Sequence, residues 1–227
     1  MGYNRAQWKF LNKCFKTTVG EGWKEKISGI KMLELGCQIM KKPLRQVLNL
    51  ESSKHSAKAY FKSLGVKHVS IDITGCFKSL SYNLTRILPS KFHNRFDTIT
   101  NSGTSEHIMP FYGQYNCFKN IHICAKLNAV IIHIVPALRT EYLGHCQIYY
   151  SKDFFYRLAK LNKYKIIYLE DVIKTSLVHL IGCCYIKQLD IDFTKNKKAL
   201  LKKIILINKK IYKNARKNRM EYRKQNH

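Results

Sequence analysis

Short apolar runs rich in β-branched residues alternate along the chain with segments whose apolar residues recur at helical spacing. The apolar runs predict strands at residues 31–35, 69–73, 96–100 and 129–135. The helical spacing predicts three helices, at residues 52–64, 115–127 and 152–161. The first is capped by Ser52 or Ser53 and closed by Gly65, and the third is capped by Ser151. The second carries Phe118, Ile121 and Cys124 on one face. Strands that alternate with helices in this way are typical of a parallel sheet covered on both faces.

The end of this pattern differs, because two predicted strands follow each other without an intervening helix. Residues 165–169 and 177–186 are β-prone runs joined by a short connection around residues 171–176. A closing hairpin of this kind makes one strand antiparallel to the others. The run 129–135 is apolar almost throughout and is stopped by Pro136, so we expect it at the buried centre of the sheet.

The two ends of the chain lie outside this alternation. Residues 1–30 combine a helical pattern of Trp8, Phe10, Leu11 and Phe15 with a glycine-broken loop, which predicts an accessory element that covers the site. Residues 31–194 form the predicted α/β domain. Residues 195–227 are expected to form a basic amphipathic helix that frays after Tyr212, with an apolar side made of Leu200, Leu201, Ile204, Ile205, Ile207 and Ile211.

Length and charge set the broad class of the protein. The 227 residues, 45% of them hydrophobic, suffice for one core without support from a metal or a disulfide. The formal net charge of +27 favours binding to nucleic acid or to other polyanions. An AT-biased coding sequence, which enriches Lys, Ile, Asn and Tyr together, explains the charge equally well, so both explanations stay open.

The cysteines and the apolar runs predict a cellular compartment. The chain has eight cysteines but no C-x-x-C pair, so we expect buried thiols in a reducing compartment. The N-terminus has no apolar signal-peptide core, and the apolar runs are too short to cross a bilayer. These features predict a soluble protein of the cytoplasm or of another intracellular reducing compartment.

Three of the predicted strands end in groups that can bind a ligand. Glu34 and Gly36 lie at the end of the first strand, Asp72 lies at the end of the second, and residues 101–107 follow the third. In an open α/β sheet, such strand ends meet at one edge, where ligands bind. A glycine turn lets the backbone approach an adenosine-like ligand, and a carboxylate at the next strand end accepts hydrogen bonds from ribose hydroxyls.

These segments resemble the class I S-adenosylmethionine-dependent methyltransferases over residues 31–186, with one glycine in a turn that usually has more. The resemblance implies a doubly wound, mostly parallel, seven-stranded Rossmann-like sheet with helices on both faces and a C-terminal antiparallel hairpin. It also implies S-adenosylmethionine as the cofactor. The cofactor-binding residues that it implies are Glu34, Leu35, Gly36, Cys37, Gln38, Asp72, Ile73, Asn101, Ser102 and Gly103.

Other nucleotide-binding classes fit the sequence less well. No G-x-G-x-x-G follows the first strand, and Asp72 lies much further along than the roughly 20 residues expected of a minimal dinucleotide-binding unit. An inserted loop at residues 38–50 explains this separation. No G-x-x-x-x-G-K-[ST] motif occurs, so nucleotide hydrolysis has no support.

The methyl acceptor would meet the residues that follow the third strand. Glu106 or His107 is placed to act as a base that takes a proton from the acceptor, and His145 lies in a loop on the same side of the predicted sheet. The alternative is that this polar segment is structural, with Thr104 or Ser105 only capping the next helix.

The remaining histidines and aromatic residues leave their roles open. His133 interrupts an apolar run and is interpreted as a core histidine with its hydrogen bonds satisfied. Convergence of His107, His133 and His145 with Cys146 would make a metal site conceivable, but the spacing alone gives little support, and we predict no metal. Aromatic residues that could either stack on a substrate or pack in the core are Tyr142, Tyr149, Tyr150, Phe154 and Phe155.

Two hypotheses from different classes follow. The first is an S-adenosylmethionine-dependent methyltransferase that acts on an unidentified O or N acceptor. The second is a non-catalytic RNA-binding or ribonucleoprotein component of the same fold that works through its basic tail, and an RNA methyltransferase would combine the two. Binding of the tail to anionic lipid is a weaker alternative, because the apolar stripe would equally pack against the domain. The acceptor and the oligomeric state are left open.

Overall fold

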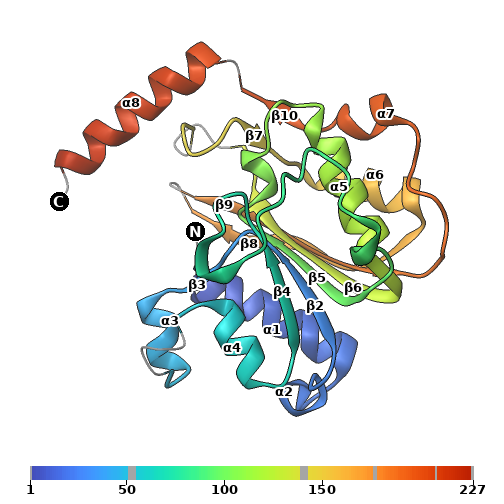
Figure 1. The fold of residues 1–227 in the computed structure, drawn as a ribbon. Coiled ribbons are helices and arrows are strands. Elements are labelled where there is room, and N and C mark those ends of the chain that lie inside the picture. Colours follow the sequence, from blue (N-terminus) through green and yellow to red (C-terminus); the bar gives the residue numbers. More distant parts are fainter. Residues whose placement is uncertain (1, 51–54, 139–142, 176–177, 208, 226–227) are drawn as a thin grey trace.

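A computed structural model of the chain describes residues 2–50, 55–138, 143–175, 178–207 and 209–225 (Figure 1). Its centre is a six-stranded sheet in the order β4-β2-β5-β6-β9-β8. The strands of this sheet are β2 (Lys31–Leu35), β4 (Lys67–Ile71), β5 (Phe96–Ser102), β6 (Ala125–Pro136), β8 (Tyr164–Lys174) and β9 (His179–Lys187). β4, β2, β5 and β6 are parallel neighbours, whereas β9 runs antiparallel to both β6 and β8. The predicted parallel sheet and its closing hairpin are therefore confirmed.

The central sheet has six strands, whereas the resemblance implied seven. In the described part of the chain, the segment between β4 and β5 contains no further sheet strand but two short 3₁₀ turns, η2 (Cys76–Lys78) and η3 (Ser90–Phe92). An isolated bridge joins Ile71 to Leu80. Pro89 directly precedes η3 and has no amide hydrogen to donate to a neighbouring strand, so this part of the segment is poorly suited to a sheet.

Residues of the central strands alternate between two hydrophobic clusters, one on each face of the sheet. On β2, Met32 belongs to the first cluster and Leu33 to the second. The first face is covered by α1 (Arg5–Val19) and α4 (Ala57–Ser63), and the second by α5 (Gly113–Cys124), α6 (Lys152–Asn162) and α7 (Lys197–Leu201) (Figure 1). The sheet is thus doubly wound, as predicted.

Helix α1 is part of the core. A capping box starts the helix, because the Asn4 side chain accepts a hydrogen bond from the Gln7 amide and the Gln7 side chain bonds back to the Asn4 amide. Trp8 is buried and meets Tyr60 of α4 edge-on, with ring centroids 5.1 Å apart. The segment 1–30 therefore packs on a face of the sheet. We had expected it to cover the site, and this expectation was wrong. The division of the chain at residues 30 and 194 stays a prediction.

The predicted helices occur with shifted ends. α5 and α6 confirm two of them, and Ser151 caps α6 by accepting a hydrogen bond from the Phe154 amide at 3.2 Å. α4 is shorter than predicted and is capped by Ser56, whose hydroxyl accepts a hydrogen bond from the Ala59 amide at 3.1 Å. The caps predicted at residues 52 and 53 lie outside the described residues.

Four short elements complete the N-terminal half. A parallel pair forms between the first residues of the chain and the insertion after β2, and it ties the two segments together. Proline at the start of a helix has its φ angle already set, which favours a short helix inside that insertion. These elements are β1 (Gly2–Tyr3), α2 (Trp23–Lys26), β3 (Ile39–Met40) and α3 (Lys42–Val47).

The C-terminal segment is not the single helix that we expected. It consists of α7, then β10 (Ile205–Leu206), then α8 (Lys209–Gln225). β10 pairs antiparallel with β7 (Ile148–Tyr149). The β-branched residues at 204, 205 and 207 favour an extended chain, so the run interrupts the helical pattern. α8 continues well beyond Tyr212, where fraying was expected.

Helix α8 projects from the body of the molecule (Figure 1). Its backbone reaches the connection between β6 and β7 at Gly144, where a β-carbon would lie 2.6 Å from the amide nitrogen of Arg216. Only glycine leaves room for this approach. Within the described residues, none of the helices combines the length and the apolar character that crossing a membrane requires.

Candidate functional site

The turn after β2 depends on its single glycine. Gly36 has a φ of 80°, in the left-handed region that favours glycine. A β-carbon at this position would also collide with the hydroxyl oxygen of Thr104. That hydroxyl donates a hydrogen bond to the Leu35 carbonyl at 2.8 Å and so holds the turn against the end of β5.

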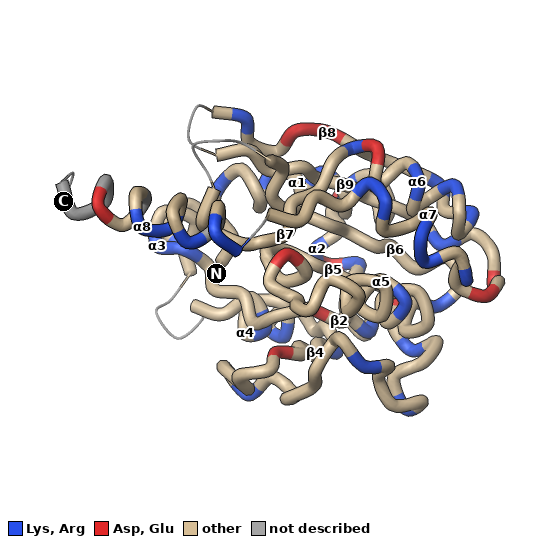
Figure 2. The backbone as a smooth tube through the Cα atoms, turned by 90° about the horizontal axis from the view of Figure 1, so that it is seen from above, with Lys and Arg blue, Asp and Glu red and all other residues tan. Residues whose placement is uncertain are grey.

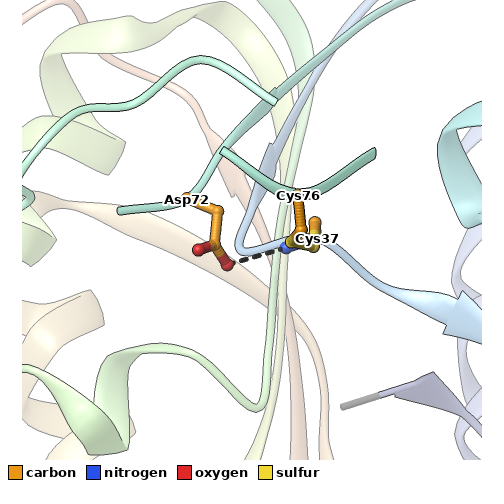
Figure 3. Close-up of side chains that lie close together, drawn as sticks. All are labelled: Cys37, Asp72 and Cys76. Carbon is orange, nitrogen blue, oxygen red and sulfur yellow. Dashed lines mark hydrogen bonds between the residues drawn. A yellow bond between two sulfur atoms is a disulfide. The ribbon is translucent and has the colours of Figure 1, made fainter. Parts of the chain in front are cut away.

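Asp72 follows β4 at the same edge of the sheet. One carboxylate oxygen accepts a hydrogen bond from the Cys37 amide at 3.2 Å (Figure 3). The other accepts from the amide and the hydroxyl of Thr74 at 2.8 and 2.6 Å. Burial by itself raises the pKa of this carboxyl group, but the hydrogen bonds from Thr74 and Cys37 outweigh burial and hold the pKa below its usual value. Asp72 is therefore ionised at neutral pH and is tied to the glycine turn.

A disulfide joins the same two turns. Cys37 and Cys76 are bonded through their sulfur atoms, with α-carbons 6.2 Å apart (Figure 3). The expectation that all the cysteines are thiols is therefore wrong for these two. The other six are buried and form no disulfide, as expected. The two bonded residues are 39 positions apart, and neither belongs to a C-x-x-C pair, so no sequence pattern signalled the bridge.

A cavity of about 260 Å³ opens at the ends of β2, β4 and β5. Several predicted residues come together in its lining. The predicted cofactor residues among them are Gly36, Cys37, Gln38, Asp72, Ile73 and Gly103, and the predicted acceptor residue His107 lines the same cavity. Gly36 and Asp72 thus face one shared space.

The lining also contains residues that were not predicted to bind the cofactor or the acceptor. Apart from Ile71, the last residue of β4, they come from two segments, one between β4 and β5 and the other around the 3₁₀ turn η4 (Ser105–His107). The only sequence feature that could have pointed to the segment between β4 and β5 is the adjacent pair Tyr82 and Asn83. Such pairs are too common to indicate a site. The additional lining residues are Ile71, Tyr82, Asn83, Leu84, Thr85, Thr104, Ile108 and Met109.

Four predicted cofactor residues are not part of the cavity lining: Glu34, Leu35, Asn101 and Ser102. All four are buried. Glu34 lies beneath the turn, where one of its carboxylate oxygens accepts a hydrogen bond from the Gln38 amide at 3.5 Å. Burial raises the pKa of Glu34 to about 8. A role of these four residues in cofactor binding stays a prediction.

The three predicted acceptor residues meet at this edge of the sheet. Glu106 is 1% exposed, its Oε2 has no hydrogen-bond partner among the described residues, and burial raises its pKa to about 8. The Nε2 of His107 lies 3.9 Å from the Oε1 of Glu106, and the His107 ring lies 5.2 Å from the ring of His145, centroid to centroid. One ligand atom from each of the three residues lies within 4.8 Å of the other two.

Buried hydrogen bonds hold η4 from the inside of the domain. Gln114 of α5 donates to the carbonyl oxygens of Ser105 and Ile108 at 2.6 and 2.9 Å. The Tyr150 hydroxyl donates to the side-chain oxygen of Gln114 at 2.6 Å and lies 2.9 Å from the Ser105 hydroxyl. Asn101 donates to that same hydroxyl at 2.9 Å. This network, rather than a helix cap by Ser105, fixes the position of the turn.

His133 is a core residue, as interpreted from the sequence, and the aromatic candidates that the structure describes take the core alternative of the two that were left open. The Nδ1 of His133 lies 3.1 Å from the side-chain nitrogen Nδ2 of Asn101, and burial lowers the pKa of His133 to about 3. His133 does not join the cluster of Glu106, His107 and His145. Tyr142 lies outside the described residues, and the other aromatic candidates are all buried: Tyr149, Tyr150, Phe154 and Phe155.

Comparisons with known proteins agree with this architecture. No family model matches the sequence, and none of the curated proteins matches it either. Among solved structures, the N-methyltransferase NodS from Bradyrhizobium japonicum WM9, in complex with S-adenosyl-L-homocysteine, is 10% identical, with a TM-score of 0.54 over 81% of this chain and 88% of NodS. The [4+2]-cyclase SpnF is 10% identical, with a TM-score of 0.55 over 83% of each chain.

The chain shares a doubly wound, mostly parallel α/β fold with NodS and SpnF, and this is the fold that the sequence predicted. Identities near 10% support the shared fold and nothing finer. Since one of the two similar proteins is a methyltransferase and the other a cyclase, the fold by itself does not fix the reaction. The chemistry has to be argued from the residues of this chain.

Proposed function

We propose that the protein is an S-adenosylmethionine-dependent methyltransferase. The observation that carries this proposal is the shared cavity of Gly36 and Asp72, at the strand ends where α/β sheets bind their ligands. An ionised Asp72 is suited to accept hydrogen bonds from the ribose hydroxyls, and Gly36 lets the backbone approach the methionine part. The cofactor would thus lie across the two turns that the Cys37–Cys76 disulfide joins.

The cavity is small for a pocket that binds S-adenosylmethionine. Its volume of about 260 Å³ is slightly below the roughly 300–1,000 Å³ usual for small-molecule pockets. A bound cofactor would therefore displace part of the rim or project from it. Two rim residues from the unpredicted segments, Tyr82 and Met109, are candidates for that adjustment.

Calorimetry with S-adenosylmethionine and S-adenosylhomocysteine tests the proposal. Loss of the charge-assisted hydrogen bonds in Asp72→Ala should weaken binding about 10-fold to 100-fold. The matched control is Asp97→Ala, because Asp97 is also hydrogen-bonded, to the Lys31 amide and to Lys126, but does not line the cavity. Absence of binding to the parent protein, or equal affinity of the two variants, would overturn the proposal.

The acceptor side would be formed by Glu106, His107 and His145. Methyl transfer requires the donor and the acceptor to be aligned, and a base helps when the acceptor must lose a proton. Burial lowers the pKa of His107, so its imidazole is neutral at pH 7 and able to take a proton. His107 is also the member of this group that lines the cavity. An acceptor hydroxyl or amine would therefore lie against His107.

A second candidate function, binding of RNA or another polyanion, is favoured by α8. A groove of about 660 Å³ lies between α8 and Gln147. Lys and Arg residues follow one another along α8 (Figure 2). The residues of α8 that line the groove are Lys209, Lys213, Arg216, Lys217, Met220 and Glu221. An RNA methyltransferase would use this groove for affinity and the strand-end cavity for chemistry.

Fluorescence anisotropy with a labelled single-stranded RNA tests the second candidate. Replacing Lys209, Lys213, Arg216 and Lys217 by Gln should weaken binding and flatten its dependence on salt, with the slope reduced by about 0.7 for each phosphate that is no longer neutralised. The control replaces four exposed lysines elsewhere: Lys9, Lys62, Lys67 and Lys160. Equal reductions in the two variants would indicate attraction by the overall charge and would reject a binding site on α8.

A further inference from the structure

The cluster of Glu106, His107 and His145 is not closed by its own hydrogen bonds. The Glu106 carboxylate and the His107 imidazole are 3.9 Å apart, too far for a direct hydrogen bond. The Oε2 of Glu106 is buried and has no hydrogen-bond partner among the described residues. A buried carboxyl oxygen without a hydrogen-bond partner is costly, whether or not the group is ionised, unless another group supplies the missing interaction.

The ligand atoms of the three residues are close enough for one ion to bind between them after small side-chain movements. Their ligand atoms lie within 4.8 Å of one another, whereas the ligand atoms of a tetrahedral zinc ion, bound at about 2.0–2.2 Å, are roughly 3.3 Å apart. Side-chain adjustments of about 1 Å would therefore bring the three atoms into a coordination shell. The buried bonds of Gln114 and Tyr150 hold η4, so one side of this shell is already fixed.

We propose that Glu106, His107 and His145 form a binding site for a divalent transition-metal ion of the zinc type. Two imidazoles and one carboxylate are a donor set that zinc uses in catalytic sites, where a fourth position stays open. This site goes beyond the expectation from sequence, which included no metal. It is carried by the orphaned carboxylate oxygen of Glu106 and by the convergence of three donors from two separate segments.

The site also narrows the class of acceptor, and this step rests on the proposed methyltransferase function. His107 belongs both to the ion cluster and to the lining of the strand-end cavity. An ion held by His107 would therefore border the space in which the acceptor lies. Coordination would use the lone pair of the His107 imidazole, so the ion would replace His107 as the group that promotes loss of the acceptor's proton. Oxygen donors are common zinc ligands, and a bound divalent ion lowers the pKa of a coordinated hydroxyl. The acceptor class that fits is a compound with a hydroxyl group.

A second cluster of donors is a competitor that the test must separate. Cys37, Asp72 and Cys76 also lie close enough to hold an ion, but the two sulfur atoms are bonded to each other (Figure 3). A thiolate is needed to bind zinc, so this second cluster is available only after reduction. Titrations are therefore made on the oxidised protein, without a reducing agent.

The test is a zinc titration of the chelator-treated, full-length protein, followed by calorimetry and by cobalt substitution. We expect one ion per chain, and a loss of affinity of about 10-fold to 100-fold or more in Glu106→Gln, His107→Ala and His145→Ala. The controls are His93→Ala, at a histidine whose Nε2 bonds to the Leu88 carbonyl and which is outside the cluster, and the double variant Cys37→Ser with Cys76→Ser. Both should bind zinc as the parent does. Cobalt should give a visible absorption band without the charge-transfer band of a thiolate ligand.

Each other outcome overturns the site. No binding by the parent protein, unchanged binding in His145→Ala, or loss of binding in the double cysteine variant would each reject it. His145 lies in a surface connection, so its variant remains informative if Glu106→Gln fails to fold. Binding of S-adenosylhomocysteine is measured separately: cofactor binding without zinc binding rejects only the metal site, and zinc binding without cofactor binding rejects only the methyltransferase.

Discussion

Glu34 is a carboxyl group that the fold keeps almost completely from water. It is 1% exposed, and the Nε2 of His68 lies 3.8 Å from its Oε2. Burial raises the pKa of Glu34 to about 8, and burial together with Lys58 and Lys62 lowers the pKa of His68 to about 3. Both groups are therefore uncharged at pH 7, and the pair does not act as a salt bridge.

The raised pKa of Glu34 predicts a dependence of stability on pH. Between the unfolded pKa of 4.5 and the folded pKa of about 8, the folded protein keeps a proton that the unfolded chain releases. The free energy of unfolding should therefore fall as the pH rises through this window, by at most about 1.4 kcal/mol per pH unit. Glu34→Gln should remove this contribution and become more stable than the parent at pH 8.5, as measured by urea denaturation.

Glu106 provides the internal comparison for that measurement. Burial raises its pKa to about 8 as well, so part of the pH dependence should persist in Glu34→Gln. Asp153→Asn serves as a control, since Asp153 is an exposed carboxylate with a side-chain exposure of 69%. Parallel pH profiles for the parent and Glu34→Gln would contradict the prediction.

Among single residues, the sequence predicts which ones line the cavity when they directly follow a recognisable strand. Gly36 and Asp72 follow recognisable strands, and both line the cavity. Tyr82 and Thr85 line the same cavity but come from a segment without regular structure, so their place depends on long-range packing. Glu106 was predicted as a base from its position alone, and its burial became visible only in the folded chain.

The disulfide is a constraint between two elements, the turn after β2 and the turn η2 after β4. It closes a loop between residues 39 positions apart in the sequence. Asp72 lies within this loop and accepts a hydrogen bond from the amide of Cys37. The bridge therefore limits how far the turn that carries Asp72 can move away from Gly36.

Removal of the bridge should reduce stability. Cys76→Ser should lower the free energy of unfolding by about 2–4 kcal/mol, because the unfolded chain regains the conformational entropy of an open loop. The measurement is guanidinium denaturation with and without a reducing agent. The parent should be sensitive to reduction and the variant insensitive, and Cys124→Ser, at a free buried cysteine, should keep the sensitivity. A parent with the same midpoint in both conditions would contradict the role of the bridge.

Elements were predictable where one local pattern dominates. β2 matches its predicted position because of its apolar run, and α6 does so because apolar periodicity and the serine cap agree. The C-terminal segment combines helical spacing with a β-branched run at 204–207, and the pairing of β10 with β7 decides between them. Such pairing connects segments far apart in the chain, which a window of sequence does not contain.

At the scale of the whole molecule, positive charge dominates the surface. The formal net charge is +27, and Lys and Arg are spread over the body as well as over α8 (Figure 2). Charges of one sign repel each other and destabilise the compact state, an effect that salt screens. The folded state is therefore expected to be destabilised by repulsion between its positive charges, and salt in the solvent should reduce this repulsion.

Thermal unfolding at two salt concentrations tests this effect. Raising sodium chloride from about 0.05 to about 0.5 M should increase the melting temperature, with each kcal/mol gained worth about 2–4 °C for a chain of this size. Deletion of residues 209–227 should reduce the increase, because this deletion removes a run of basic residues. A melting temperature that is constant or falls with salt would show that repulsion does not limit stability.

The backbone of α8 rests on Gly144, the residue directly before His145. A ligand that binds α8 and shifts it would also move this connection, and with it one donor of the ion cluster. Thermodynamic linkage then requires reciprocity: whatever factor a polyanion imposes on metal affinity, the metal imposes on polyanion affinity. Occupancy of the groove along α8 would in this way be communicated to the neighbouring ion cluster through a single residue that lacks a side chain.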